Sequence, residues 1–217
     1  MTEPLHHRMY LTAYDTAAQS LFDRPRTGFL LRAAVLTELA IRGHLTEIEG
    51  VAAVAAAGST GDSVLDKALN DVGEYRRSWK AWLRYDRKET LEAVEDQLAA
   101  LGVLTIEEKE KSSFGLGSKR QLTVTDPVAA QALQDRASAI LHAGDSAERV
   151  DPADAALVAL AAAGGIRAVL SRKDGRDHKD RIEALTDRLG DIAPGLEKAV
   201  HSLRVTMIAA QGGMGGS

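Results

Sequence analysis

Arg32 is the residue whose type and surroundings point most clearly to chemistry. It lies in the apolar segment GFLLRAAVLTELAIRGHL, residues 28–45. If this segment is helical, at about 100° per residue, the neighbours of Arg32 are apolar residues and glycines. Glu38 lies roughly 120° away and sits instead over Arg42 at the i, i+4 spacing. Because burying an unpaired guanidinium costs several kcal/mol or more, on the order of a buried unpaired charge, some anion must meet Arg32.

Two interpretations of Arg32 remain open from the residues alone. One is a structural ion pair with an acid from another element, or a long side chain that reaches out of the helix start. The other is a phosphate site. An arginine near the first turn of a helix adds a forked donor to the free backbone N–H groups and to the positive end of the helix dipole.

The elements that must position these residues are mostly helical. The chain has 217 residues, of which 45% are hydrophobic and 4% aromatic. Its apolar residues recur mainly at spacings of three and four, and alanine and leucine dominate, which favours helix. We therefore expect a mainly α, single-domain multi-helix bundle over residues 1–211, followed by a flexible tail, GGMGGS, at 212–217.

Start and stop signals divide the chain into elements. Asp62 is suited to cap a helix, Asp86 and Glu89 have the spacing of a capping box, and Gly43 and Gly102 are suited to end helices. The segment 51–62 begins with a short apolar run that reads equally as strand or helix and continues as a turn. The predicted helices cover residues 5–21, 28–41, 64–72, 86–102, 127–143, 152–163, 179–189 and 194–210. One β-hairpin is predicted from residues 103–107 and 120–125, with its tip at 114–117.

Composition and charge restrict the function classes. The formal net charge of −4 gives no general attraction to polyanions, so any such affinity must come from a local basic patch. The chain has no cysteine, which excludes disulfides and thiolate metal sites and suits a reducing cytoplasm. The N-terminus has no signal-peptide core, and no run of about 18 apolar residues is present. We expect a cytoplasmic protein, either soluble or peripherally attached to a membrane.

Several blocks of the sequence resemble one known family. These are LLRAAVLTELAIRGHL, STGDSVLDKAL, VEDQLAALGVLT before the hairpin, DAALVALAAAGGIRAVL and DRIEALTD. Their order and spacing are similar to those of the Golgi phosphoprotein 3 family. The resemblance implies a mainly α-helical adaptor that binds phosphatidylinositol 4-phosphate on membranes and the cytoplasmic tails of membrane proteins. It implies neither catalysis nor a cofactor.

The resemblance also implies a lipid pocket. The family pocket has an arginine in the LR block, which is Arg32 here, and an aromatic residue about two turns earlier, where Phe22 stands in for a tryptophan. It has two basic residues one turn apart on the helix before GVL, where this chain has Lys88 and Leu91. Nearby cations are candidates to compensate for Leu91. With the neighbouring arginines added to the residues that the resemblance implies, the predicted lipid-phosphate contacts are Arg32, Lys88, Arg87, Arg84, Phe22 and Arg24.

The hairpin tip is a second candidate for contact with a membrane. Phe114 and Leu116 lie at the predicted turn between lysines, and each cation near an anionic membrane contributes on the order of 1 kcal/mol. The sequence is also consistent with a solvated turn or with a contact between copies in an oligomer. We predict membrane contact for Phe114 and Leu116.

A winged-helix nucleic-acid-binding module is the alternative function. Helix, glycine, strand, basic turn and strand follow one another over residues 91–125. The helix of such a module should present basic residues to DNA, yet here it carries Glu92, Glu95 and Asp96, which repel phosphates. Nucleic acid is therefore the less favoured partner.

An enzyme is not indicated by the sequence. The six histidines have no metal-ligand spacing such as H-E-x-x-H, and there is no G-x-S-x-G motif or P-loop. The adjacent pair His6 and His7 is expected to lie in a flexible terminus. We predict no catalytic residue, no metal site and no cofactor.

Overall fold

The computed structural model describes residues 3–109 and 119–212, and it describes side chains over residues 3–107 and 121–203. The fold is mainly α, as predicted. The helices are α1 (Leu5–Thr12), α2 (Arg24–Ile41), α3 (Ser63–Glu74), α4 (Trp79–Arg84), α5 (Arg87–Ala100), α6 (Pro127–His142), α7 (Pro152–Gly164), α8 (Asp174–Asp177), α9 (Lys179–Asp187) and α10 (Pro194–Gly212), with a 3-10 turn at Ala147–Arg149.

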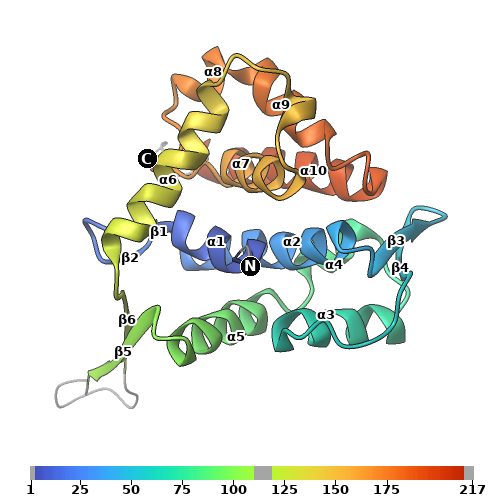
Figure 1. The fold of residues 1–217 in the computed structure, drawn as a ribbon, viewed down its shortest axis with the longest axis horizontal. Coiled ribbons are helices and arrows are strands. Elements are labelled where there is room, and N and C mark those ends of the chain that lie inside the picture. The colour runs from blue at the N-terminus through green and yellow to red at the C-terminus, as the bar shows by residue number, and fades with distance from the viewer. Residues whose placement is uncertain (1–2, 110–118, 213–217) are drawn as a thin grey trace.

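The helices form three layers, with α1 and α2 in the middle (Figure 1). On one side lie α3 and α5, and on the other α7 and α10. Because α2 contacts both outer layers, nearly every residue from Leu30 to Ala40 is buried, whatever direction it faces on the helix. This central position explains why the sequence of α2 is apolar around most of its circumference, and it places Arg32 in the core.

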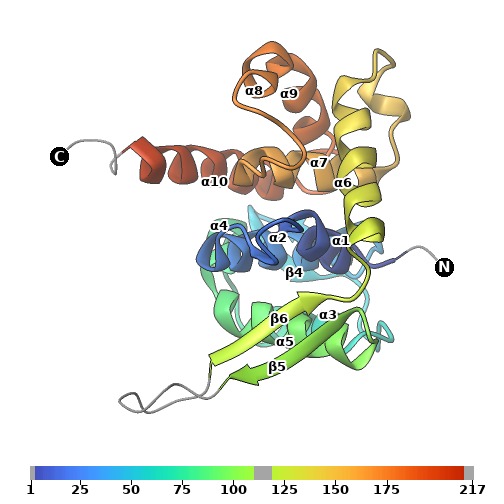
Figure 2. The same cartoon turned by 90° about the vertical axis from the view of Figure 1, so that its left-hand side faces the viewer.

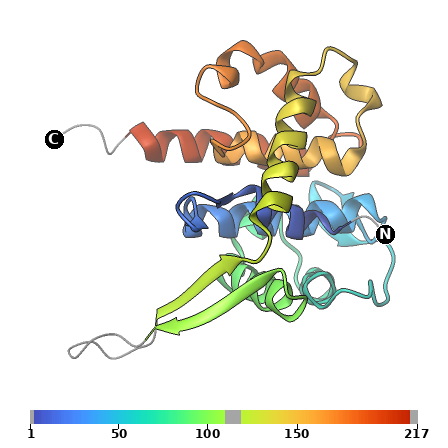
Figure 3. The same cartoon turned by 60° about the vertical axis from the view of Figure 1, so that its left-hand side comes forward.

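The C-terminal half joins the layers. Helix α6 follows the β5–β6 hairpin and runs past α1 toward α8 and α9 (Figure 3). Helix α10 extends beyond the other helices on the same side as the far end of the hairpin (Figure 2). The two tryptophans of α4, Trp79 and Trp82, are both buried in the common core.

The prediction of a single hairpin was wrong, because the described residues form three two-stranded antiparallel sheets. The strands are β1 (Tyr14–Asp15), β2 (Ser20–Leu21), β3 (Leu45–Ile48), β4 (Val51–Val54), β5 (Leu104–Lys109) and β6 (Lys119–Val124). Between β3 and β4, Glu49 and Gly50 both have positive φ. This is the backbone geometry of the two-residue turn that joins two antiparallel strands directly. Residues 51–54, at the start of the segment that could have been strand or helix, therefore form a strand.

The predicted helix over residues 5–21 ends early, at Thr12. The side chain of Asp15 accepts hydrogen bonds from the backbone N–H groups of Ala17 and Ala18, which stabilises a turn in place of further helix. Helix α2 in turn starts earlier than residue 28. Asp23 caps it by accepting from the N–H of Arg26, and Pro25 occupies the first turn, where no N–H is needed.

The predicted helix ends are mostly confirmed. Asp62 caps α3 by accepting from the N–H groups of Val64 and Leu65, and Gly43 and Gly102 have positive φ after α2 and α5. The prediction of a capping box at Asp86 is wrong. Asp86 has a left-handed backbone, with φ 54°, makes no side-chain cap and forms an ion pair with Lys67 of α3.

Candidate functional site

A groove lies where the first turns of α2 and α5 come together. It is lined by Arg24, Pro25, Gly28, Arg87, Lys88, Leu91 and Glu92, and its volume is about 370 Å³. Three of the six predicted lipid-phosphate contacts, Arg24, Arg87 and Lys88, are therefore brought together. We call this feature the α2–α5 groove.

Gly28 allows the two helix starts to approach closely. A Cβ atom on this residue would lie 2.8 Å from the carbonyl oxygen of Arg87, closer than side-chain carbons approach backbone oxygens in proteins. Arg24 begins α2 and Arg87 begins α5, so the positive ends of two helix dipoles face the same region. Since Asp86 provides no side-chain cap, the first N–H groups of α5 keep their capacity to bind an anion.

The cations of the groove differ in how far they are neutralised. The Arg24 guanidinium forms two hydrogen bonds with the carboxylate of Glu95, at 2.5 and 2.9 Å, and these raise the pKa of Arg24. Lys88 is 77% exposed, and its Nζ lies 3.6 Å from Oε1 of Glu92. Arg87 lies over the ring of Phe29, 4.2 Å from its centroid. Among the side chains that the structure describes, no carboxylate lies within ion-pairing distance of Arg87, so its charge is the most available.

Arg84 lies in a smaller hollow next to the groove. Lys80, Arg84 and Phe29 line this hollow together with residues of α10, and its volume is about 30 Å³. Phe29 thus contacts Arg87 of the groove and also borders the hollow that holds Arg84. Lys80 and Arg84 of α4 and Arg87 and Lys88 at the start of α5 are all exposed cations.

Arg32 lies in the core and does not line the groove. Its side chain is 2% exposed, its Nε donates to the backbone oxygen of Trp82 at 3.3 Å, and its guanidinium lies over the rings of Trp82 and Tyr85. Nη2 lies 3.9 Å from Oδ2 of Asp71 on α3, which is too long for a hydrogen bond. Burial lowers the pKa of Arg32, and the carboxylates of Asp71 and Asp86 partly offset this effect.

The structure therefore shows an acid from another helix facing Arg32, which was one of the two interpretations of the sequence. Nη2 makes no hydrogen bond within the described part of the chain, so the pairing is incomplete. Direct contact between Arg32 and a phosphate stays a prediction. The case for anion binding rests instead on the cations of the α2–α5 groove.

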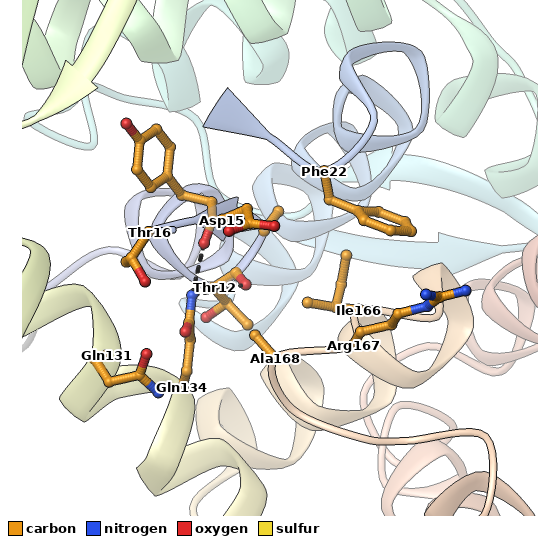
Figure 4. Close-up of a pocket in the computed structure, with 11 residues that line it drawn as sticks. Thr12, Asp15, Thr16, Phe22, Gln131, Gln134, Ile166, Arg167 and Ala168 are labelled. Carbon is orange, nitrogen blue, oxygen red and sulfur yellow. Dashed lines mark hydrogen bonds between the residues drawn. The ribbon is translucent and has the colours of Figure 1, made fainter. Parts of the chain in front are cut away.

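Phe22 lies at a different cavity, of about 370 Å³, between β1–β2, α6 and the loop after α7 (Figure 4). Phe22 is 37% exposed and stacks with Arg26, and Gln134 donates to the backbone oxygen of Tyr14 across the cavity wall. The structure does not bring Phe22 to the α2–α5 groove. Phe114 and Leu116 lie outside the described residues.

The expectation for His6 and His7 was wrong. Both residues lie in α1, with 0% and 4% exposure, and both contact Gln97 of α5. Their burial was not predicted because their partner, Gln97, comes from a distant part of the sequence.

These observations define the protein as a mainly α-helical protein with a basic groove at the starts of two helices. No helix within residues 3–109 and 119–212 combines the length and the apolar character needed to cross a bilayer. The family follows from comparison of the whole chain: residues 5–203 match the Golgi phosphoprotein 3 (GPP34) family model, so the chain belongs to this family. No curated protein matches the sequence. The family is one of non-catalytic adaptors with lipid and protein interactions.

Proposed function

We propose that this protein is a peripheral membrane adaptor that binds an anionic phosphorylated lipid headgroup, of the phosphatidylinositol 4-phosphate type, without catalysis. The observation that carries the proposal is the α2–α5 groove, where Arg87 and Lys88 flank the start of one helix beside the start of another. Membership of the Golgi phosphoprotein 3 family supports this choice of ligand class.

The groove offers each kind of group that a phosphate binds. Free N–H groups of the first turn of α5 donate to phosphate oxygens, and the helix dipole adds about 0.3–1 kcal/mol at an exposed site. The guanidinium of Arg87 supplies a fork of donors and Lys88 supplies a point charge. Lys88 must give up its exposed pair with Glu92, which costs no more than about 1 kcal/mol.

The remaining predicted residues take supporting places in this proposal. Lys80 and Arg84 attract the anionic membrane around the headgroup. Arg32 acts as a positioning residue, because it holds Trp82 and Tyr85 in the segment that leads directly into α5. Phe114 and Leu116 insert shallowly into the membrane, and cytoplasmic tails of membrane proteins are the proposed protein partners. The proposal does not use Phe22.

Vesicle flotation tests the proposed function. The protein is mixed with vesicles of phosphatidylcholine, of phosphatidylcholine with phosphatidylinositol 4-phosphate, and of phosphatidylcholine with phosphatidylserine at equal total charge. We expect flotation with the phosphoinositide vesicles, less with phosphatidylserine and none with phosphatidylcholine. Equal flotation with all three, or none with any, contradicts the proposal. A salt-sensitive mobility shift of duplex DNA at submicromolar protein would favour the winged-helix alternative.

A further inference from the structure

Two histidines, an aspartate and a glutamine from three helices meet at one point inside the protein. His6 and His7 come from the start of α1, Asp62 from the N-cap of α3, and Gln97 from α5. Nε2 of His6 lies 3.3 Å from Oδ2 of Asp62 and 3.2 Å from Oε1 of Gln97, and Nε2 of His7 lies 2.8 Å from the same Gln97 oxygen. One ligand atom from each of His6, His7 and Asp62 lies within 4.8 Å of the others.

These spacings resemble the edges of a metal-coordination tetrahedron. Zinc binds imidazole nitrogen and carboxylate oxygen at about 2.0–2.2 Å, so ligand atoms around a tetrahedral ion lie on the order of 3.3 Å apart. Two of the contacts in the cluster, at 3.3 and 3.2 Å, already have nearly this length, and the third, at 2.8 Å, is shorter. Because the ligand atoms of His6, His7 and Asp62 lie within 4.8 Å of one another, metal binding requires the side chains to move toward a common centre. Imidazole and carboxylate are also a donor set that zinc and its neighbours in the first transition row accept.

We propose that His6, His7 and Asp62 bind a divalent first-row transition metal ion of the zinc class, with Oε1 of Gln97 as the fourth ligand. Such an ion would join α1, α3 and α5. The proposal is independent of the lipid-binding function, because none of the four side chains lines the α2–α5 groove.

The polar atoms of the cluster converge in the way that metal ligands do. Nε2 of His6 faces one oxygen of Asp62 and one of Gln97, and Nε2 of His7 faces the same Gln97 oxygen. A cation between them would satisfy all four groups at once. Nδ1 of His6 has no partner among the described residues with or without a metal, so it favours neither interpretation.

The carboxylate of Asp62 is oriented for this role. Its Oδ1 accepts hydrogen bonds from the N–H groups of Val64 and Leu65, at 2.9 and 3.1 Å, which fixes the plane of the group and leaves Oδ2 directed at His6. Asp62 is also the least buried of the three, with its side chain 10% exposed.

Isothermal titration with zinc tests the proposal on the full chain after treatment with a chelator. We expect one equivalent of zinc to bind, and thermal unfolding to shift to higher temperature as zinc is added. His6→Ala and His7→Ala should each weaken zinc binding by more than about tenfold. The matched control is His142→Ala, which removes a histidine from the more exposed cluster of His142, Asp174 and His178. That control should leave the tight site intact.

Because His6 and His7 are buried, a second variant guards against simple misfolding. Asp62→Asn keeps a good N-cap for α3 through its side-chain oxygen and removes the charge that faces the ion. It should retain the circular dichroism of the wild type and lose zinc affinity by more than about tenfold. If the wild type binds no zinc, or if Asp62→Asn binds it unchanged, the cluster is a hydrogen-bond network only. Loss of binding in His142→Ala alone would assign the metal to the surface cluster and overturn the proposal.

Discussion

Gly28 of α2 and Arg87 of α5 touch backbone to backbone: a Cβ atom on Gly28 would lie 2.8 Å from the carbonyl oxygen of Arg87. This contact sets the distance between the two helix starts and therefore the shape of the α2–α5 groove. A carbonyl oxygen in a helix has little freedom to move, so any side chain at this position must push the helices apart.

Gly28→Ala is the first variant that follows from this contact. We expect it to lower the free energy of unfolding by about 1–3 kcal/mol, because the added methyl group overpacks the contact. Vesicle binding should fall as the groove changes shape. The matched control is Gly73→Ala in α3, where the nearest atom to the new Cβ is 3.7 Å away. That substitution should stabilise the protein by up to about 1 kcal/mol. Equal effects of the two substitutions in urea denaturation would contradict the account.

Arg32→Ala should be among the most destabilising substitutions in the chain. It removes a large core side chain and leaves the rings of Trp82 and Tyr85 without their stacked cation, so we expect a loss of about 2–5 kcal/mol. Arg172→Ala on the surface should change stability by less than about 0.5 kcal/mol. Vesicle binding should weaken more in Arg32→Ala than in Arg172→Ala. An Arg32 variant with normal stability would show that this residue does not position the start of α5.

The ion pairs of Asp154 with Arg136 and Arg8 should make the stability of the folded protein depend on pH. Burial raises its pKa, but hydrogen bonds from Arg136 and Arg8 outweigh that effect, so its pKa in the folded protein is below the usual value. The stabilisation is therefore present above the unfolded pKa of about 3.9 and is lost as the pH falls through the folded pKa.

The variant Asp154→Asn measures this contribution. At pH 7 it should unfold more easily than the wild type by about 1.5–3 kcal/mol, the value of hydrogen bonds to charged groups. The difference should shrink as the pH falls below about 4, because the wild-type carboxyl takes up a proton first in the unfolded chain and then, at lower pH, in the folded protein. Urea denaturation between pH 7 and 3 follows both proteins. A difference that stays constant over this range would rule out the carboxylate as its source.

Local patterns in the sequence predicted most of the helices but not the contacts that build the sites. Gly43, Gly102 and Asp62 act on their immediate neighbours, so their roles were readable from sequence. The turn at Asp15 was missed because one side chain, through two hydrogen bonds to backbone N–H groups, outweighed helical periodicity.

The partners of Arg32, His6 and Gly28 could not be predicted in the same way. Asp71, Gln97 and Arg87 each come from another helix, and only the packing of the three layers brings them into contact. Of the residues predicted for the lipid site, Arg87 and Lys88 line the α2–α5 groove, whereas Phe22, taken as an aromatic substitute, lies at another cavity.

The most direct test of the central claim compares two double variants in vesicle flotation. Arg87→Glu with Lys88→Glu reverses the charge at the groove, and Arg172→Glu with Lys173→Glu makes the same change in net charge elsewhere. Lys88 is 77% exposed and pairs with Glu92, and Lys173 is 79% exposed and pairs with Asp177, in each case an acid four residues later. We predict that the groove variant loses at least about tenfold in affinity for phosphatidylinositol 4-phosphate vesicles, at about 1 kcal/mol per charge, while the control stays within about twofold. Equal losses in both variants, or none in the groove variant, would contradict the assignment of the headgroup to the α2–α5 groove.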